Sequence, residues 1–213
     1  MARNHRVWFP NAKYHVTSRG NRKETLFYEP QDYFKFLTIL KETKDKYPFI
    51  IQSYCLMTNH YHLQINTQQY NISYIMQIIN SNYARYHNKK YELTGHVFQG
   101  RCNPELILFP DYELEVNRYI HLNPLKANIV TNLNDYPWSS YHAYAHNKPD
   151  PLIDDTSQFL TLFPHPQQKN YNEFLLSKRK SYEIILHPPK TNQNSNQTVL
   201  EKGGYEDHGI NHL

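Results

Sequence analysis

The sequence predicts an α+β fold in which an antiparallel sheet carries helices on one face. Short runs of alternating apolar and polar residues, typical of strands, are interspersed with longer runs whose apolar residues recur at helical spacing. Their order along the chain is βα-ββ-αβ-α, which is close to a ferredoxin-like split βαβ unit. At 213 residues, the chain has room for one medium domain with extensions.

Three of the four predicted strands and one helix come from the first 66 residues. Tyr14–Arg19 alternates with β-branched residues and ends at a Gly-Asn turn, so we predict a strand. A helix is predicted over Pro30–Lys44, because proline is favoured at a helix start and apolar side chains follow at helical spacing. Phe49–Leu56 and His60–Asn66 are predicted strands with a short connection, and we expect them to form a hairpin.

The remaining elements complete the predicted unit. One face of large side chains indicates a helix from Ile72 to Asn88, and Glu105–Phe109 is a fourth strand. Asp111–His121 is a helix whose acidic first turn suits the helix dipole, and we expect Pro124 to end it because the residue before a proline avoids the α region. Ser139 is expected to cap a short helix that continues through Ala145.

Composition suggests three segments and an intracellular protein. We expect a main domain over 1–147, a helical extension over 148–187 and a disordered tail over 188–213, where large apolar residues are scarce. No apolar run approaches the roughly 18–20 residues of a membrane span, and no secretory signal is visible. Cys55 and Cys102 are too few for a disulfide framework, so we predict reduced, buried thiols in a cytoplasmic protein.

Positive charge is concentrated in the first part of the chain. Residues 1–149 hold 17 Lys and Arg against 11 Asp and Glu, whereas residues 150–213 hold 6 against 8. The first 28 residues contain six cations and one acid, Glu24, with aromatic residues between them. This pattern suits a polyanionic partner, with an ordinary solvated face as the alternative on charge alone.

Two short patterns contain residues that could carry chemistry. His60 and His62 are two positions apart in a strand, so their rings leave the same face and can chelate one metal ion. With 13 histidines in the chain, however, such a pair also arises by chance and can be purely structural. Tyr119 and Asn123 share a helix face if the helix continues that far; a core tyrosine and a capping asparagine are the alternative.

Five stretches together resemble a known family of enzymes. Leu56-Met-Thr-Asn-His-Tyr-His-Leu63, Tyr119-Ile-His-Leu-Asn-Pro124 and Tyr136-Pro-Trp-Ser-Ser-Tyr141 resemble the signature stretches of single-tyrosine HUH transposases, the IS200-like family. The branch that the chain is most similar to is the REP-associated tyrosine transposases, which Tyr14-His-Val-Thr-Ser-Arg-Gly20 and Val97-Phe-Gln-Gly-Arg101 also match. The resemblance extends over residues 8–146, so the main domain is expected to be an HUH single-tyrosine transposase domain.

The resemblance implies an active site and a reaction. It makes His60 and His62 metal ligands, Tyr119 the nucleophile, and Asn123 a third polar group near the metal. The implied cofactor is a divalent metal, Mg²⁺ or Mn²⁺, which would act as a Lewis acid on the scissile phosphate. The implied activity is nicking and strand transfer of single-stranded DNA at a hairpin, such as a palindromic repeat, through a 5′-phosphotyrosine intermediate.

The resemblance also directs attention to candidate DNA contacts. Four cations are candidates for the DNA backbone and two aromatic residues for base stacking, each with a structural role as the alternative. They are Arg19, Arg22, Lys23 and Arg101, and Tyr14 and Phe98. A cytoplasmic, nucleoid-associated protein without membrane contact is expected, as a monomer or a homodimer. At Asn103 the sequence departs from the family pattern, because members of the family more often carry a basic residue or serine slightly further on.

Two other functions are compatible with the predicted fold. A domesticated, non-catalytic DNA hairpin-binding regulator would keep the fold but would not need all four of His60, His62, Tyr119 and Asn123. An RNA-recognition module would carry a basic-Gly-aromatic strand motif, which Val97–Arg101 does not fit. The enzyme is therefore the favoured prediction.

Overall fold

The computed structural model describes residues 7–177 of the chain, so the predicted tail over 188–213 lies outside the described residues. The strands are β1 (Lys13–Arg19), β2 (Ile50–Met57), β3 (His60–Asn66) and β4 (Asn103–Ile107). The helices are α1 (Pro30–Lys46), α2 (Ile72–Lys90), α3 (Pro110–Lys126), α4 (Tyr141–His146), α5 (Ser157–Leu160) and α6 (Gln167–Leu176), with 3₁₀ turns at Asn21–Lys23 and Leu133–Asp135. Within the described part, no helix is long and apolar enough to cross a membrane.

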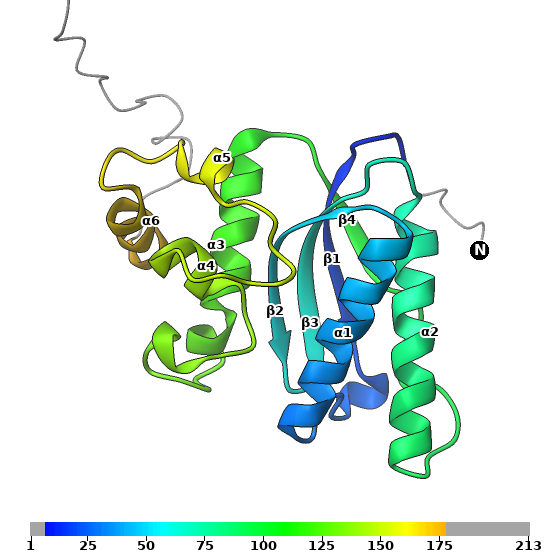
Figure 1. Cartoon of the computed structure of the whole chain (residues 1–213). Coiled ribbons are helices and arrows are strands. Elements are labelled where there is room, and N and C mark those ends of the chain that lie inside the picture. The colour runs from blue at the N-terminus through cyan, green and yellow to red at the C-terminus, as the bar shows by residue number, and fades with distance from the viewer. Residues whose placement is uncertain (1–6, 178–213) are drawn as a thin grey trace, which may run out of the picture.

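The strands form one antiparallel sheet in the order β2-β3-β1-β4, as Figure 1 shows. The predicted hairpin between β2 and β3 is confirmed, and β1 lies between β3 and β4. This order and the connections through α1 and α2 confirm the ferredoxin-like unit. Cys55 and Cys102 are both buried, as predicted.

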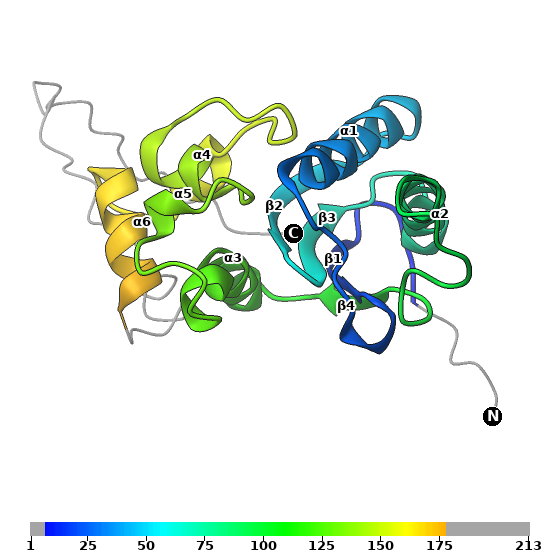
Figure 2. The same ribbon diagram turned by 90° about the horizontal axis from the view of Figure 1, so that it is seen from below.

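The two faces of the sheet are covered by different helices. Side chains that alternate along β1 and β3, such as Val16 and Leu63, are buried in one core with residues of α1 and α2. On the other face, Cys55 and Met57 of β2 pack in a second apolar cluster with Val116 and Ile120 of α3. The expectation of helices on one face therefore holds for α1 and α2 but is wrong for α3, which lies across the opposite face (Figure 2).

Helix α3 continues past the residue that was expected to end it. Pro124 lies inside α3, which runs to Lys126. A proline here removes one N–H from the last turn of the helix. Leu122 and Leu125, on either side of the proline, pack against an apolar cluster formed by the C-terminal helices, and this tertiary packing offsets the local preference for stopping.

The C-terminal helices join α3 through a buried polar chain as well as apolar contacts. The Tyr171 hydroxyl of α6 donates to Asn117 Oδ1 at 2.7 Å and lies 2.5 Å from His121 Nδ1. His121 Nε2 in turn lies 2.7 Å from Ser140 Oγ, and the side chain of His121 is fully buried. His121 therefore faces away from Tyr119. The apolar cluster around α6 contains residues from both sides of the predicted boundary at residue 147.

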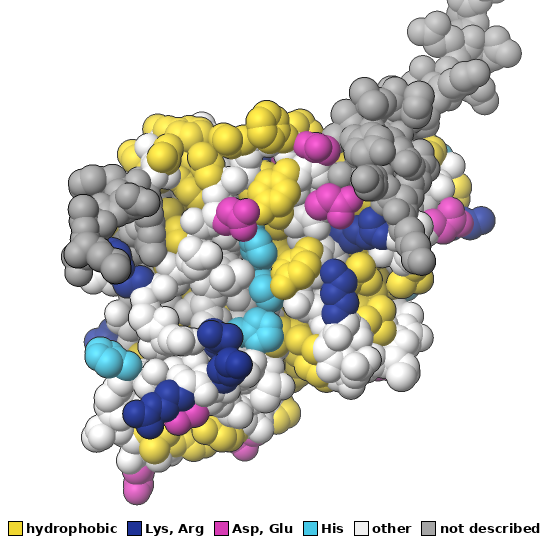
Figure 3. Space-filling model, turned by 180° about the vertical axis from the view of Figure 1, so that it is seen from behind, with side chains coloured by type: hydrophobic (Ala, Val, Ile, Leu, Met, Phe, Trp, Pro, Cys, Tyr) yellow, Lys and Arg dark blue, Asp and Glu magenta, His cyan; other side chains and the backbone are white. Residues whose placement is uncertain are grey.

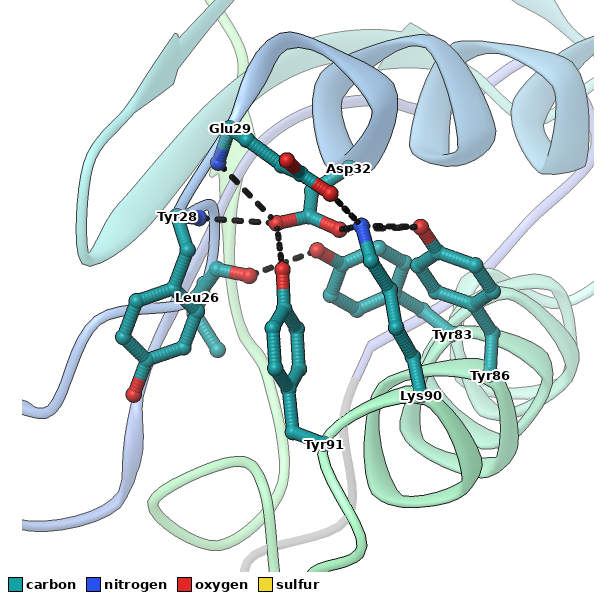
Figure 4. Close-up of polar contacts among 8 residues, drawn as sticks. All are labelled: Leu26, Tyr28, Glu29, Asp32, Tyr83, Tyr86, Lys90 and Tyr91. Carbon is teal, nitrogen blue, oxygen red and sulfur yellow. Dashed lines mark hydrogen bonds and ion pairs between the residues drawn. The ribbon is translucent and has the colours of Figure 1, made fainter.

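A second polar cluster joins α1 to α2 on the other side of the molecule (Figure 4). Its centre is Asp32, which is fully buried in the first turn of α1. The carboxylate accepts hydrogen bonds from the backbone of Tyr28 and from the side chains of Tyr86, Lys90 and Tyr91. Because each of its oxygens has several donors, the charge can remain buried.

Candidate active site

The strand register brings three histidines to the face covered by α3. Thr17 of β1 lies opposite His62 of β3, and Arg19 lies opposite His60, so His15, two residues before Thr17, shares the face with both. The rings of His60 and His62 have centroids 5.1 Å apart, and those of His15 and His62 are 5.2 Å apart. His15 Nε2 lies 3.0 Å from His62 Nδ1, within hydrogen-bond distance.

Helix α3 places Tyr119 against this histidine cluster. The Tyr119 ring meets the His62 ring edge to face at 5.2 Å between centroids, and the His15 ring at 5.8 Å. The side chain is 41% exposed, so its phenol is accessible to a substrate. The Lys126 ammonium, two turns further along the helix, lies 4.9 Å from the centre of the Tyr119 ring and forms a cation–π contact.

The cluster lies in a cavity of about 1210 Å³ in which the Lys and Arg side chains outnumber the acids. Figure 3 shows histidines at the centre of this face with Lys and Arg on either side. The positive residues that line the cavity are Arg19, Lys23, Arg101, Arg118 and Lys126, against the acids Glu105 and Glu115. A hollow with this charge suits a phosphodiester backbone.

Burial keeps the three imidazoles neutral at physiological pH. Burial, with smaller contributions from the neighbouring His15 and His60, lowers the pKa of His62 to about 3. Burial also lowers the pKa of His60, with Arg19 acting in the same direction, and that of His15, where the Glu105 carboxylate opposes the effect. Neutral imidazoles retain the lone pair that a metal ion requires.

The nitrogens of the two predicted ligands fit a divalent cation. His62 Nε2 is buried and has no hydrogen-bond partner among the described residues. His60 Nδ1 is hydrogen bonded to Asn59 Oδ1 at 2.7 Å, which leaves Nε2 for another partner. Within residues 7–177, no group of three or more His, Cys, Asp and Glu side chains could hold a metal, so other oxygen atoms, from the substrate, water or a side-chain amide, would have to complete the coordination of an ion on this pair.

Asn123 is close in sequence to the site but is turned away from its cavity. Its side chain is buried, donates from Nδ2 to the Tyr119 carbonyl at 2.8 Å, and does not line the cavity that holds His60, His62 and Tyr119. The structure therefore brings three of the four predicted site residues together. The role of Asn123 stays a prediction.

The structure separates the predicted DNA contacts into two groups. Arg19, Lys23 and Arg101 are exposed and line the cavity, whereas Arg22 is exposed outside it. Tyr14 and Phe98, the two candidates for base stacking, are only 2% and 7% exposed and belong to the core beneath α1 and α2, which agrees with the structural alternative for both. A buried ring has no free face for a base.

Sequence reasoning missed two residues of the site, His15 and Lys126. The alternation along β1 places His15 on the same side as Arg19, which is a usable signal, but only the pairing of β1 with β3 brings it to His62. Lys126 was missed because the helix was expected to end before it.

Comparison with known proteins agrees with the resemblance read from the sequence. The family model described as "Transposase IS200 like" matches residues 9–104. This match confirms the resemblance of the chain to the IS200-like transposases.

Two further comparisons concern particular relatives. A Haemophilus influenzae protein named "Putative REP-associated tyrosine transposase" is 28% identical over 121 residues, which cover 51% of this chain and 68% of the relative. A solved structure of a REP-associated tyrosine transposase bound to a REP hairpin superposes with a TM-score of 0.60 at 19% identity, covering 73% of this chain and 92% of that one. At that identity, the superposition establishes a shared fold.

Proposed function

We propose that this protein is a metal-dependent nickase and strand transferase that acts on single-stranded DNA at hairpins. The observation that carries the proposal is the meeting of Tyr119 from α3 with His60 and His62 from β3 in one basic cavity. The family match and the hairpin-bound relative of the same fold support DNA hairpins as the substrate class.

In the proposed reaction, Tyr119 Oη attacks the phosphorus of the scissile phosphodiester. The new bond joins Oη to phosphorus, the bond from phosphorus to the 3′-oxygen breaks, and the phenol loses its proton while the 3′-oxygen gains one. The products are a 5′-phosphotyrosine and a free 3′-hydroxyl. Because one phosphodiester replaces another, the reverse reaction with a second 3′-hydroxyl joins strands without an external energy source.

The side chains of the cavity would hold and orient the strand during this reaction. Arg19, Arg101 and Lys126 are exposed cations around Tyr119 that can contact successive phosphates. Mg²⁺ or Mn²⁺ held by His60 and His62 would supply a positive charge that polarises the scissile phosphate. We further propose Asn123 as a third ligand, which requires its amide to leave the Tyr119 carbonyl.

A covalent adduct tests the proposal directly. Wild-type protein, Tyr119→Phe and the control Tyr74→Phe are incubated with a library of end-labelled single-stranded hairpins, with Mn²⁺ or with EDTA. Tyr74 is a matched control because its exposure, 45%, is close to that of Tyr119, and it lies on α2 away from the cavity. We expect a metal-dependent band that resists denaturation, keeps only the DNA 3′ of the cut, and is lost in Tyr119→Phe alone.

Other outcomes would contradict the proposed chemistry in different ways. Hairpin retardation under native conditions without an adduct in any metal would favour the non-catalytic hairpin-binding regulator. An adduct that persists in Tyr119→Phe would remove Tyr119 as the nucleophile. If no hairpin of the library is retarded and none forms an adduct, that result would contradict hairpin DNA as the substrate.

A further inference from the structure

His15 makes a buried contact to the proposed metal ligand His62. The two side chains are 8% and 5% exposed, and His15 Nε2 lies 3.0 Å from His62 Nδ1 with the ring planes inclined by 24°. Between two neutral imidazoles, one nitrogen must donate a proton and the other must accept it. The contact therefore determines which nitrogen of His62 carries its proton.

The neighbouring ligand shows how the chain fixes a histidine tautomer. Asn59 Nδ2 donates to the carbonyl of Lys23 at 3.1 Å, which turns Asn59 Oδ1 toward His60. This oxygen can only accept, so His60 Nδ1, 2.7 Å away, carries the proton and Nε2 has a free lone pair. His60 is thus held in the tautomer that a metal ion needs.

Two proton arrangements are possible at His62, and they have different consequences. If His15 donates, His62 carries its proton on Nε2, which is buried and has no acceptor among the described residues. Such a proton is unsatisfied, and the nitrogen that bears it cannot bind a metal. If His62 donates from Nδ1, its buried Nε2 has a lone pair instead. His62 is then in the same tautomer as His60.

We propose that His15 is a positioning residue: its Nε2 accepts the His62 Nδ1 proton and keeps His62 Nε2 bare for a divalent cation. His15 then carries its own proton on Nδ1, on a strand position that pairs with Glu105 of β4, whose carboxylate lines the same cavity. His15 is not itself a ligand, because its Nε2 is occupied by His62. The role rests on the proposed function of the site.

The His15 ring also contacts the proposed nucleophile. Its centroid lies 5.8 Å from that of Tyr119, in an edge-to-face arrangement, and the His62 ring meets Tyr119 in the same way. One side chain of β1 thus sets the tautomer of a ligand and supports the ring that would attack the phosphate. Outer partners of metal-binding histidines commonly act in this manner.

The test compares two variants of His15 in the full-length protein. His15→Gln keeps an acceptor near the position of imidazole Nε2, whereas His15→Phe fills the space without one. Long-range ¹H–¹⁵N spectra of the metal-free protein distinguish the two neutral tautomers of His62, whose signal is assigned from its loss in His62→Asn. His146→Phe, which removes an exposed histidine of α4, is the control.

We expect the Nδ1-protonated tautomer of His62 in wild type, His15→Gln and His146→Phe, and its loss in His15→Phe. Titration with Mn²⁺ is expected to show affinity about tenfold to a hundredfold weaker in His15→Phe and nearly unchanged in His15→Gln. A proton on His62 Nε2 in the wild type would overturn the proposal without any variant, even where His15→Phe does not fold. So would a His15→Phe protein with unchanged tautomer and Mn²⁺ affinity. The expected tautomers without Mn²⁺ binding in the wild type would support the positioning role and contradict the metal site.

Discussion

The substitution Asp32→Asn tests how strongly one buried carboxylate joins α1 to α2. The Lys90 ammonium and the Tyr91 hydroxyl each lie 2.6 Å from this carboxylate. Tyr86 and the backbone N–H of Tyr28 donate at 2.9 and 2.8 Å. Burial raises the pKa of Asp32, but these hydrogen bonds outweigh burial and lower its pKa to about 2. The cluster therefore stabilises the ionised form in the folded state.

The size of the effect follows from the pKa and from the donors left without an acceptor. A pKa of about 2, against the ordinary 3.8 of an aspartate, corresponds to about 2 kcal/mol of stabilisation. An asparagine keeps one acceptor oxygen and turns an NH₂ group toward donors, which adds the cost of unsatisfied buried groups. We expect Asp32→Asn to lower the free energy of unfolding by about 3 kcal/mol and Tm by about 6–12 °C.

The depressed pKa of Asp32 also determines how its contribution to the free energy of unfolding changes with pH. Because the pKa of Asp32 is depressed in the folded protein, its contribution is fully present above about pH 4 and is lost as the pH falls toward 2. Urea denaturation followed by circular dichroism at pH 7 and at pH 3 measures it. Asp45→Asn is the control, because Asp45 lies on the same helix in an exposed pair with Lys41 and should contribute less than about 0.5 kcal/mol. Equal stability of the two variants at pH 7, or a deficit of Asp32→Asn that does not shrink at pH 3, would refute the reasoning.

Three further predictions concern the turn after β1, the cavity wall and the C-terminal helices. Gly20→Ala should destabilise the protein by about 2 kcal/mol or more in urea denaturation, because the added Cβ would lie 2.1 Å from the Glu24 carbonyl oxygen. A stability equal to that of the wild type would show that the turn relaxes freely. Lys126→Ala should reduce the salt dependence of hairpin binding by about one unit of log K per log salt in fluorescence anisotropy, with unchanged thermal stability, since this exposed side chain would meet one phosphate. A chain ending at residue 147 should lose its cooperative thermal transition, because the truncation removes Tyr171 and Phe174 from a buried apolar cluster. A sharp transition near that of the full chain would show that residues 1–147 fold alone.

Much of the fold could be predicted because it depends on local patterns. The alternation along β1 and the helical spacing after Pro30 and Ile72 determine which elements form, and few compact arrangements of that order exist. The side of the sheet that α3 covers is not a local property. It depends on apolar residues at Cys55 and Met57, whose partners Val116 and Ile120 are about 60 residues away.

The site shows the same division between local and non-local information. His60 and His62 share a strand face by alternation alone, whereas the approach of His15 requires the register of β1 against β3. The same alternation favours the structural role of Tyr14 over base stacking, because Tyr14 shares its face with Val16 and not with His15. Aromatic residues near cations resemble a stacking surface in sequence whether their rings are exposed or buried.

Helix α3 connects the sheet, the cavity and the C-terminal helices because its sides face three different environments. Val116 and Ile120 are buried against the histidine face of the sheet, and Tyr119 points into the cavity beside them. On another side, Asn117 and His121 bond to the Tyr171 hydroxyl of α6. Since a rigid helix cannot shift one side alone, the position of Tyr119 over His62 depends on both the sheet packing and the C-terminal contact. The residues after α3 therefore contribute to the geometry of the candidate active site even though the family match ends at residue 104.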